Sequence, residues 1–273
     1  MPLAIGPGSF YCIFLSYWKD SIMNITLIIV PLLLVMYLFF RFRSFPLFLR
    51  AMKTYNTGDT SKALAMLKDS VEAGLSAKHQ LTVGYLLLKE GYPEDAERIF
   101  TFLMTTPQGK FNSNHARAYS ALIHWKKGHL DEAIAELETL LESHYRTTAL
   151  YSNLGFFLIE KGDMDKALKI NLEAYEYNNQ SPVIQDNLGL CYIKTEQWAM
   201  AEEIYDKLIE SHPRFPDAWY NAALIAVHKG DKKKAESLLN SALEKKFSYL
   251  STLSKTQVEN QIEQVKGSSE IPE

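Results

Sequence analysis

The chain has 273 residues, a hydrophobic fraction of 47% and a charged fraction of 22%, which is typical of a globular protein and too apolar for a disordered one. Its formal net charge of −3 lacks the basic excess that nucleic-acid binders carry. Two cysteines, Cys12 and Cys191, are too few for a disulfide framework or a cysteine-based zinc module. These values leave a globular body of one or two domains.

The first predicted element is a transmembrane helix over residues 23–40, MNITLIIVPLLLVMYLFF, which carries no charge. A helix of this length spans about 27 Å, close to the hydrocarbon thickness of roughly 30 Å. Pro31 lies mid-span, where membrane helices tolerate proline. The alternative is a buried core helix, but the stretch lacks the amphipathic period of one.

Basic residues set the expected orientation of this helix. Lys19 alone precedes the span, whereas Arg41, Arg43, Arg50 and Lys53 follow it. Because excess Lys and Arg mark the cytoplasmic side, we expect a single-pass protein of the cell membrane with residues beyond 41 in the cytoplasm. The same four residues are candidates for contact with anionic headgroups; the alternative is that they only set topology.

Residues 1–22 have two interpretations. The apolar and aromatic stretch Phe10–Trp18 is too short to cross a bilayer as a helix, and one interpretation places it in the membrane interface. The alternative is that translation begins at Met23, because the codons for Trp18 to Asp20 can contain a purine-rich ribosome-binding sequence.

A repeat of 34 residues follows. Residues 114–147, 148–181, 182–215 and 216–249 align without gaps. In each unit an apolar periodic segment breaks at a turn before a second segment begins. The turn carries Gly128, Gly162 and Gly230, with Glu196 in the third unit, and glycine there favours the left-handed conformation that ends a helix.

The small and large positions of these units resemble the tetratricopeptide repeat (TPR) family. Small residues recur in both predicted helices, and the large position of the second helix departs from the pattern once, at Asn171. Two less regular units begin near Ser44 and Ala77. The residues that carry the resemblance are Ala121, Gly155, Gly189 and Ala223 in the first helix, and Ala133, Ala167, Ala201 and Ala235 with Leu137, Tyr205 and Leu239 in the second.

The chain is similar in plan to membrane-anchored bacterial TPR proteins, and this resemblance implies an all-α fold. We expect a right-handed solenoid of about six helix–turn–helix repeats over residues 44–249, after the transmembrane helix. A helix over 250–266 should cap it, starting at a capping box between Ser254 and Gln257, with a disordered tail over 267–273. The repeats are expected near 44–76, 77–113, 114–147, 148–181, 182–215 and 216–249.

No catalytic, cofactor or metal site is predicted. The seven histidines form no HExxH or other ligand spacing, and no phosphate-binding glycine loop is present. Cys191 fits a small structural cysteine better than a nucleophile. The alternative is an enzyme whose site these motifs miss.

One concave position of the expected solenoid carries asparagine. In the TPR family this position lies on the first helix, and it holds Asn153, Asn187 and Asn221, with Tyr119 before them. An asparagine amide can both donate to and accept from the backbone of an extended ligand. The alternative is that each asparagine bonds within its own helix or to water.

Two further concave positions are apolar, and the resemblance implies that both are exposed. An exposed apolar patch marks a binding site, and Trp125 is the best single anchor. We therefore predict a membrane-tethered, non-enzymatic scaffold that binds an extended apolar peptide or amphipathic helix of a partner protein; the alternative is that the groove binds a neighbouring copy in a homo-oligomer. The two positions hold Leu122, Phe156, Leu190 and Leu224, with Tyr85, and Trp125, Ile159, Ile193 and Val227, with Leu88.

Overall fold

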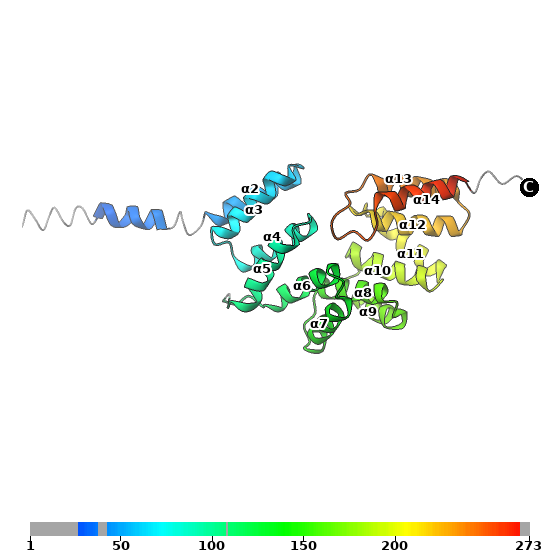
Figure 1. The fold of residues 1–273 in the computed structure, drawn as a ribbon, viewed down its shortest axis with the longest axis horizontal. Helices are drawn as coiled ribbons and strands as arrows, with labels where there is room; N and C mark the ends of the chain where they lie inside the picture. Colours follow the sequence, from blue (N-terminus) through cyan, green and yellow to red (C-terminus); the bar gives the residue numbers. More distant parts are fainter. Residues whose placement is uncertain (1–26, 38–42, 108, 268–273) are drawn as a thin grey trace, which may run out of the picture. The chain divides into compact units, whose positions relative to one another are not determined.

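The structure is a computed structural model that describes residues 27–37, 43–107 and 109–267 (Figure 1). Within these ranges all regular secondary structure is α-helical. The chain divides into two compact units, Met1–Ser76 and Ala77–Glu273. The predictions for residues 1–22, Arg41 and the tail beyond residue 267 lie outside the described residues.

In the first unit, residues 27–37 are helical and exposed. Among the described residues, no helix has both the length and the apolar character needed to cross a membrane. Helices α2 (Ser44–Asn56) and α3 (Thr60–Glu72) pair around Phe48, Ala51 and Leu67, all of them buried. The side chain of Asp59 accepts a hydrogen bond from the Lys62 amide and so caps α3.

The second unit holds five helix pairs and a final helix, which follow one another in chain order (Figure 1). The pairs begin at residues 77, 114, 148, 182 and 216, the starts of the predicted repeats. They are α4 (Ala77–Lys89) with α5 (Pro93–Thr105), α6 (Asn114–Lys126) with α7 (Leu130–Glu142), α8 (Thr148–Lys161) with α9 (Met164–Tyr177), α10 (Pro182–Lys194) with α11 (Trp198–Glu210), and α12 (Pro216–His228) with α13 (Lys232–Leu243).

The final helix, α14 (Lys255–Gly267), begins later than the expected residue 250. The capping box explains this start: the Gln257 amide donates to Ser254 Oγ, and the Ser254 amide donates to Gln257 Oε1. Val258, Ile262 and Val265 are buried against the core formed by α10 to α13, so the helix covers the last repeat. Residues 244–254 form a loop before it, called the closing loop below.

The turn inside each repeat adopts the expected left-handed backbone. Gly128, Gly162 and Gly230 have φ between 74° and 85°. Glu196, at the same position of the fourth pair, has φ 58° without being glycine. The prediction that these turns end the first helices is confirmed.

Within each repeat the two helices cross at a pair of residues sixteen positions apart. A side-chain carbon added to Gly189 would lie 2.5 Å from the ring of Tyr205, and one added to Gly84 would lie 2.5 Å from Phe100. In three other repeats these two positions hold alanine and leucine, so the summed volume is close to that of glycine with an aromatic residue, whereas the pair of Gly155 and Asn171 has a smaller summed volume. The fully buried alanine–leucine pairs are Ala51/Leu67, Ala121/Leu137 and Ala223/Leu239.

In the second unit, the first helix of each repeat also contacts the first helix of the next: α4 contacts α6, α6 contacts α8, α8 contacts α10, and α10 contacts α12. This row of first helices forms one continuous inner wall, which carries the candidate site.

Candidate functional site

The inner wall of the second unit borders a cavity of about 580 Å³, called the groove below. Its other side is formed by residues 211–215 before α12, by Asp217 at the start of α12, and by the closing loop. Seven of the twelve predicted binding residues line it: Leu122, Trp125, Asn153, Phe156, Asn187, Leu190 and Asn221.

The remaining predicted binding residues lie away from the groove: Tyr119, Ile159, Ile193, Leu224 and Val227. Ile159 is 2% exposed and Leu88 is fully buried, so the prediction that their shared position faces the groove throughout was wrong. The direct packing of successive first helices covers part of each helix that the resemblance placed in the open. Val227, on the last of these helices, is 39% exposed outside the groove.

The asparagines form a ladder between repeats. Asn153 Nδ2 donates to the backbone oxygen of Ala118 at 2.8 Å, and Asn187 Nδ2 donates to that of Ser152 at 2.8 Å. Each amide therefore bonds to the first helix of the preceding repeat, which neither predicted interpretation included. Their Oδ1 atoms accept no hydrogen bond from a described residue and remain available to a donor in the groove.

The third rung of the ladder ends on a carboxylate. Asn221 Nδ2 donates to Asp186 Oδ1 at 3.1 Å, and the Tyr205 hydroxyl donates to the same oxygen at 2.8 Å. Burial, and then the negative charge of Asp217, raise the pKa of Asp186 from its ordinary 3.8 to about 7, against the two hydrogen bonds, which lower it. Asp186 and Asp217 both line the groove and place two carboxyl groups at this end of it, where Arg214 also lines the wall.

Aromatic rings form the opposite part of the wall. Trp125 meets Phe156 edge-on with ring centroids 5.0 Å apart, and both rings are half-buried. Lys126 Nζ lies 4.1 Å from the Trp125 ring centroid and 5.2 Å from that of Tyr249 in the closing loop. Burial lowers the pKa of Lys126, with the charges of Asp217 and Glu160 acting in the opposite direction.

The closing loop forms one side of the groove, where the sequence predicted no segment of the chain. Its Tyr249 amide donates to the Lys89 backbone oxygen at 3.0 Å, and Lys246 pairs with Glu90 at 2.7 Å, so the loop reaches the first repeat of this unit. Its Thr252 amide donates to Asp217 Oδ1 at 3.3 Å. The groove is therefore open, but one side of it consists of the chain's own backbone. The sequence pattern assigned residues 244–249 to the end of the last repeat and gave no sign that this segment returns to the first repeat of the unit, which is 156 positions away in the case of Lys246 and Glu90.

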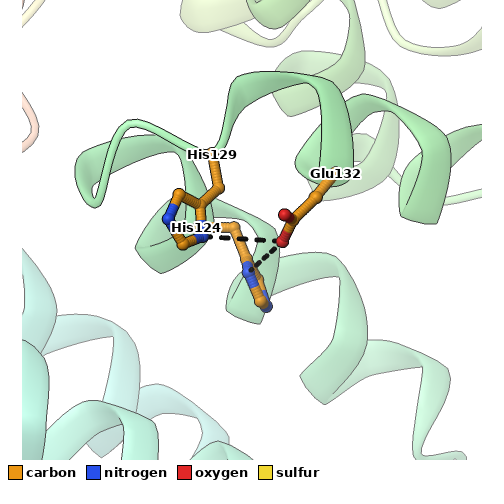
Figure 2. A group of neighbouring side chains, drawn as sticks. All are labelled: His124, His129 and Glu132. Carbon is orange, nitrogen blue, oxygen red and sulfur yellow. Dashed lines mark ion pairs between the residues drawn. The ribbon is translucent and has the colours of Figure 1, made fainter.

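Three of the predicted membrane-surface residues, Arg43, Arg50 and Lys53, are exposed on the first unit. The histidines were expected to form no metal site, but the structure brings His124 and His129 together with Glu132 at the turn between α6 and α7 (Figure 2). Their spacing, His-x4-His-x2-Glu, runs from the end of one helix to the start of the next, unlike HExxH, in which both histidines lie on one helix.

Paired antiparallel helices, packed through small residues and stacked around an inner groove, define an α-solenoid of the TPR type. A family model described as the second ARM domain of tetratricopeptide repeat protein 21 matches residues 47–253. The chain belongs to this repeat family.

Solved structures share the fold at low sequence identity. A tetratricopeptide repeat protein from Parabacteroides merdae superposes with a TM-score of 0.60 at 13% identity, covering 81% of this chain and 83% of that one. A thermophilic TPR protein of Thermus thermophilus gives 0.54 at 18% identity, covering 70% and 99%. A chain of the Cut9–Hcn1 hetero-tetramer of the APC/C gives 0.62 at 14% identity, covering 81% and 42%. No curated protein sequence is significantly similar to the chain.

Proposed function

We propose that this protein is a non-catalytic scaffold whose groove binds an extended or helical segment of a partner protein. The observation that carries the proposal is the open groove of about 580 Å³, with the half-buried Trp125 and Phe156 on its wall. Cavities of roughly 300–1,000 Å³ lined by apolar and aromatic side chains are typical ligand sites. The Cut9–Hcn1 neighbour, itself a hetero-tetramer, supports a role in protein assembly.

The polar groups of the groove narrow the chemistry of that segment. The free Oδ1 atoms of Asn153 and Asn187 accept hydrogen bonds, so they suit backbone amides of an extended chain. Asp186 and Asp217 suit a lysine or arginine side chain. We therefore expect a ligand with apolar side chains at the aromatic wall and a basic side chain about one repeat away.

Photo-crosslinking from position 125 tests the proposal. A photoreactive phenylalanine analogue at Trp125 is compared with the same analogue at Leu172, an exposed residue of α9 that does not line the groove. We expect a discrete adduct with a second protein from position 125 only, identified by mass spectrometry and weakened by Asp186→Asn. An adduct of two copies of this chain would favour the homo-oligomer instead, and equal labelling from both positions would contradict a groove ligand.

We propose in addition that residues 23–40 tether the repeats to the cytoplasmic face of the cell membrane. The support is the uncharged sequence of this segment, the four basic residues that follow it, and the exposure of its described residues 27–37. The full chain should resist extraction from membranes at alkaline pH, whereas Leu33→Arg/Leu34→Arg should be extracted. Extraction of both proteins alike would exclude the tether.

A further inference from the structure

Three side chains with metal-ligating atoms meet at the turn between α6 and α7 (Figure 2). His124 lies in the last turn of α6, His129 is the N-cap residue of α7, and Glu132 lies in the first turn of α7. Glu132 Oε2 is 3.5 Å from His129 Nδ1 and 3.9 Å from His124 Nδ1. One ligand atom from each residue lies within 4.8 Å of the other two.

These separations are close to those around a bound zinc ion. Zinc bonds to imidazole nitrogen and carboxylate oxygen are about 2.0–2.1 Å long, so neighbouring ligand atoms of a tetrahedral site are about 3.4 Å apart. The distance from Glu132 to His129 already has this value, and the distance to His124 exceeds it by about half an ångström. The third separation, between the two histidines, is at most 4.8 Å, and rotation of the side chains would be needed to bring the ligand atoms to bonding positions.

The backbone that carries the three residues is held by hydrogen bonds. The His129 amide donates to the His124 backbone oxygen at 2.9 Å, which closes the turn, and the Ala133 amide donates to the His129 oxygen at 3.1 Å. Gly128, between the histidines, has the left-handed φ of 85° that this turn requires. The ligands are therefore positioned by two helix ends before any ion binds.

A comparison with the other repeats shows that this repeat departs from their local pattern at all three positions. At the position of His129, three other repeats have an aspartate (Asp59, Asp163 and Asp231) whose side chain caps the second helix, whereas the side chain of His129 makes no cap. At the position of His124, four other repeats have a buried residue: Leu87, Leu158, Tyr192 and Ala226. At the position of Glu132, three repeats have lysine: Lys62, Lys166 and Lys234.

The folding of the repeat does not explain these residues, because a capping aspartate and a buried apolar residue would serve it better. We propose that His124, His129 and Glu132 bind a divalent transition-metal ion, zinc in the first place. Two imidazoles and one carboxylate are a ligand set that zinc accepts, and they leave a fourth position open to solvent or to a ligand from another molecule.

The test is zinc binding by the full chain, purified without a polyhistidine tag and freed of metal, in competition with a chromophoric chelator. The variants take residues from this chain's own repeats or keep the capping role: His124→Leu and His129→Asn. Matched controls are His144→Asn and Glu142→Gln, both at exposed residues of the same repeat. Asparagine is chosen at position 144 because His144 has a φ of 60°, which asparagine tolerates.

We expect one zinc ion per chain in the unsubstituted protein and in both controls. Each histidine variant should weaken binding about tenfold or more, since even the loss of a residue that only orients a ligand has an effect of that size. Magnesium chloride should not compete, because magnesium prefers oxygen ligands. In the absence of metal, the substitution His129→Asn should not lower the midpoint temperature of thermal unfolding. No zinc binding, or binding unchanged in both histidine variants, would leave only an ion pair among these residues and overturn the proposal.

Discussion

Two neighbouring repeats, residues 148–181 and 182–215, differ at the place where their helices cross. Both have a glycine in the first helix, but Gly155 faces Asn171 whereas Gly189 faces Tyr205. The amide of Asn171 donates to the Ala167 backbone oxygen of its own helix and to Cys191 Sγ on the next helix, and its Oδ1 accepts no hydrogen bond from the described residues. Tyr205 instead extends across the first helix, and its hydroxyl bonds to both the backbone oxygen and the carboxylate of Asp186.

This difference is transmitted to the groove. In the earlier repeat the Ser152 backbone oxygen is available and accepts from Asn187. In the later one the equivalent oxygen, on Asp186, accepts from Tyr205, and Asn221 bonds to the Asp186 carboxylate instead. A large aromatic residue in this core position therefore changes the partner of the third asparagine from a backbone oxygen to a buried carboxyl group in the wall of the groove. The ladder of asparagines therefore has two parts: Asn153 and Asn187 bond to neutral backbone oxygens, and Asn221 bonds to a carboxyl group.

The largest expected effect comes from Asp186→Asn. Because the folded chain raises the pKa of Asp186 from 3.8 to about 7, it holds a proton that the unfolded chain releases between these values. The free energy of unfolding should therefore fall as the pH rises from 4 to 7 and then level off, by at most about 4 kcal/mol. The variant should lose this slope and be the more stable protein at pH 8, as measured by urea unfolding. Asp165→Asn, at an exposed residue of α9, is the control and should retain the slope.

The next effect is expected from Gly189→Ala. The added carbon would lie 2.5 Å from the Tyr205 ring, which forces the two helices of the repeat apart. Overpacking of this kind lowers the free energy of unfolding by about 3 kcal/mol. Gly267→Ala, where nothing lies within 4 Å of the added carbon, should have little effect. Equal losses in both variants would show that the glycine–tyrosine contact is not tight.

Tyr205→Phe isolates the hydroxyl from the ring. Without the hydroxyl, the backbone oxygen and the carboxyl group of Asp186 lose a hydrogen-bond donor. We expect the free energy of unfolding to fall by about 2 kcal/mol. The loss should be larger at pH 8 than at pH 5, because the bond stabilises the ionised carboxylate. Tyr175→Phe, on the preceding repeat, is the matched control. A loss that does not depend on pH would argue against the bond to the carboxylate.

The smallest effect, and the only stabilisation at all pH values, is expected from Asn171→Leu. Leucine fills this position in three other repeats and removes the buried carbonyl oxygen that lacks a donor. We expect the free energy of unfolding to rise by about 1 kcal/mol, since an unsatisfied buried polar group costs about 1–3 kcal/mol and some hydrogen bonding of the amide is lost. Differential scanning calorimetry checks this, with Asn171→Asp expected to lower the midpoint. A lower midpoint for the leucine variant would contradict the assignment.

Much of the fold could be predicted from residues close in sequence. The period of 34 residues and the turn glycines placed the helix pairs, because helix ends depend on local backbone geometry such as the left-handed φ of Gly162. The capping box at Ser254 and Gln257 is likewise a contact over three residues. The binding position shared by Leu88 and Ile159 was mispredicted because its burial depends on how successive repeats pack.

The amino-acid sequence by itself determined the repeat, the order of the helices and the row of asparagines, since each follows from periodicity along one chain. Only the tertiary structure decided what those asparagines bond to, how Tyr205 reaches Asp186, and that Lys246 of the closing loop meets Glu90. These contacts join residues from different helices, and their partners are selected by distance in space after the helices have packed.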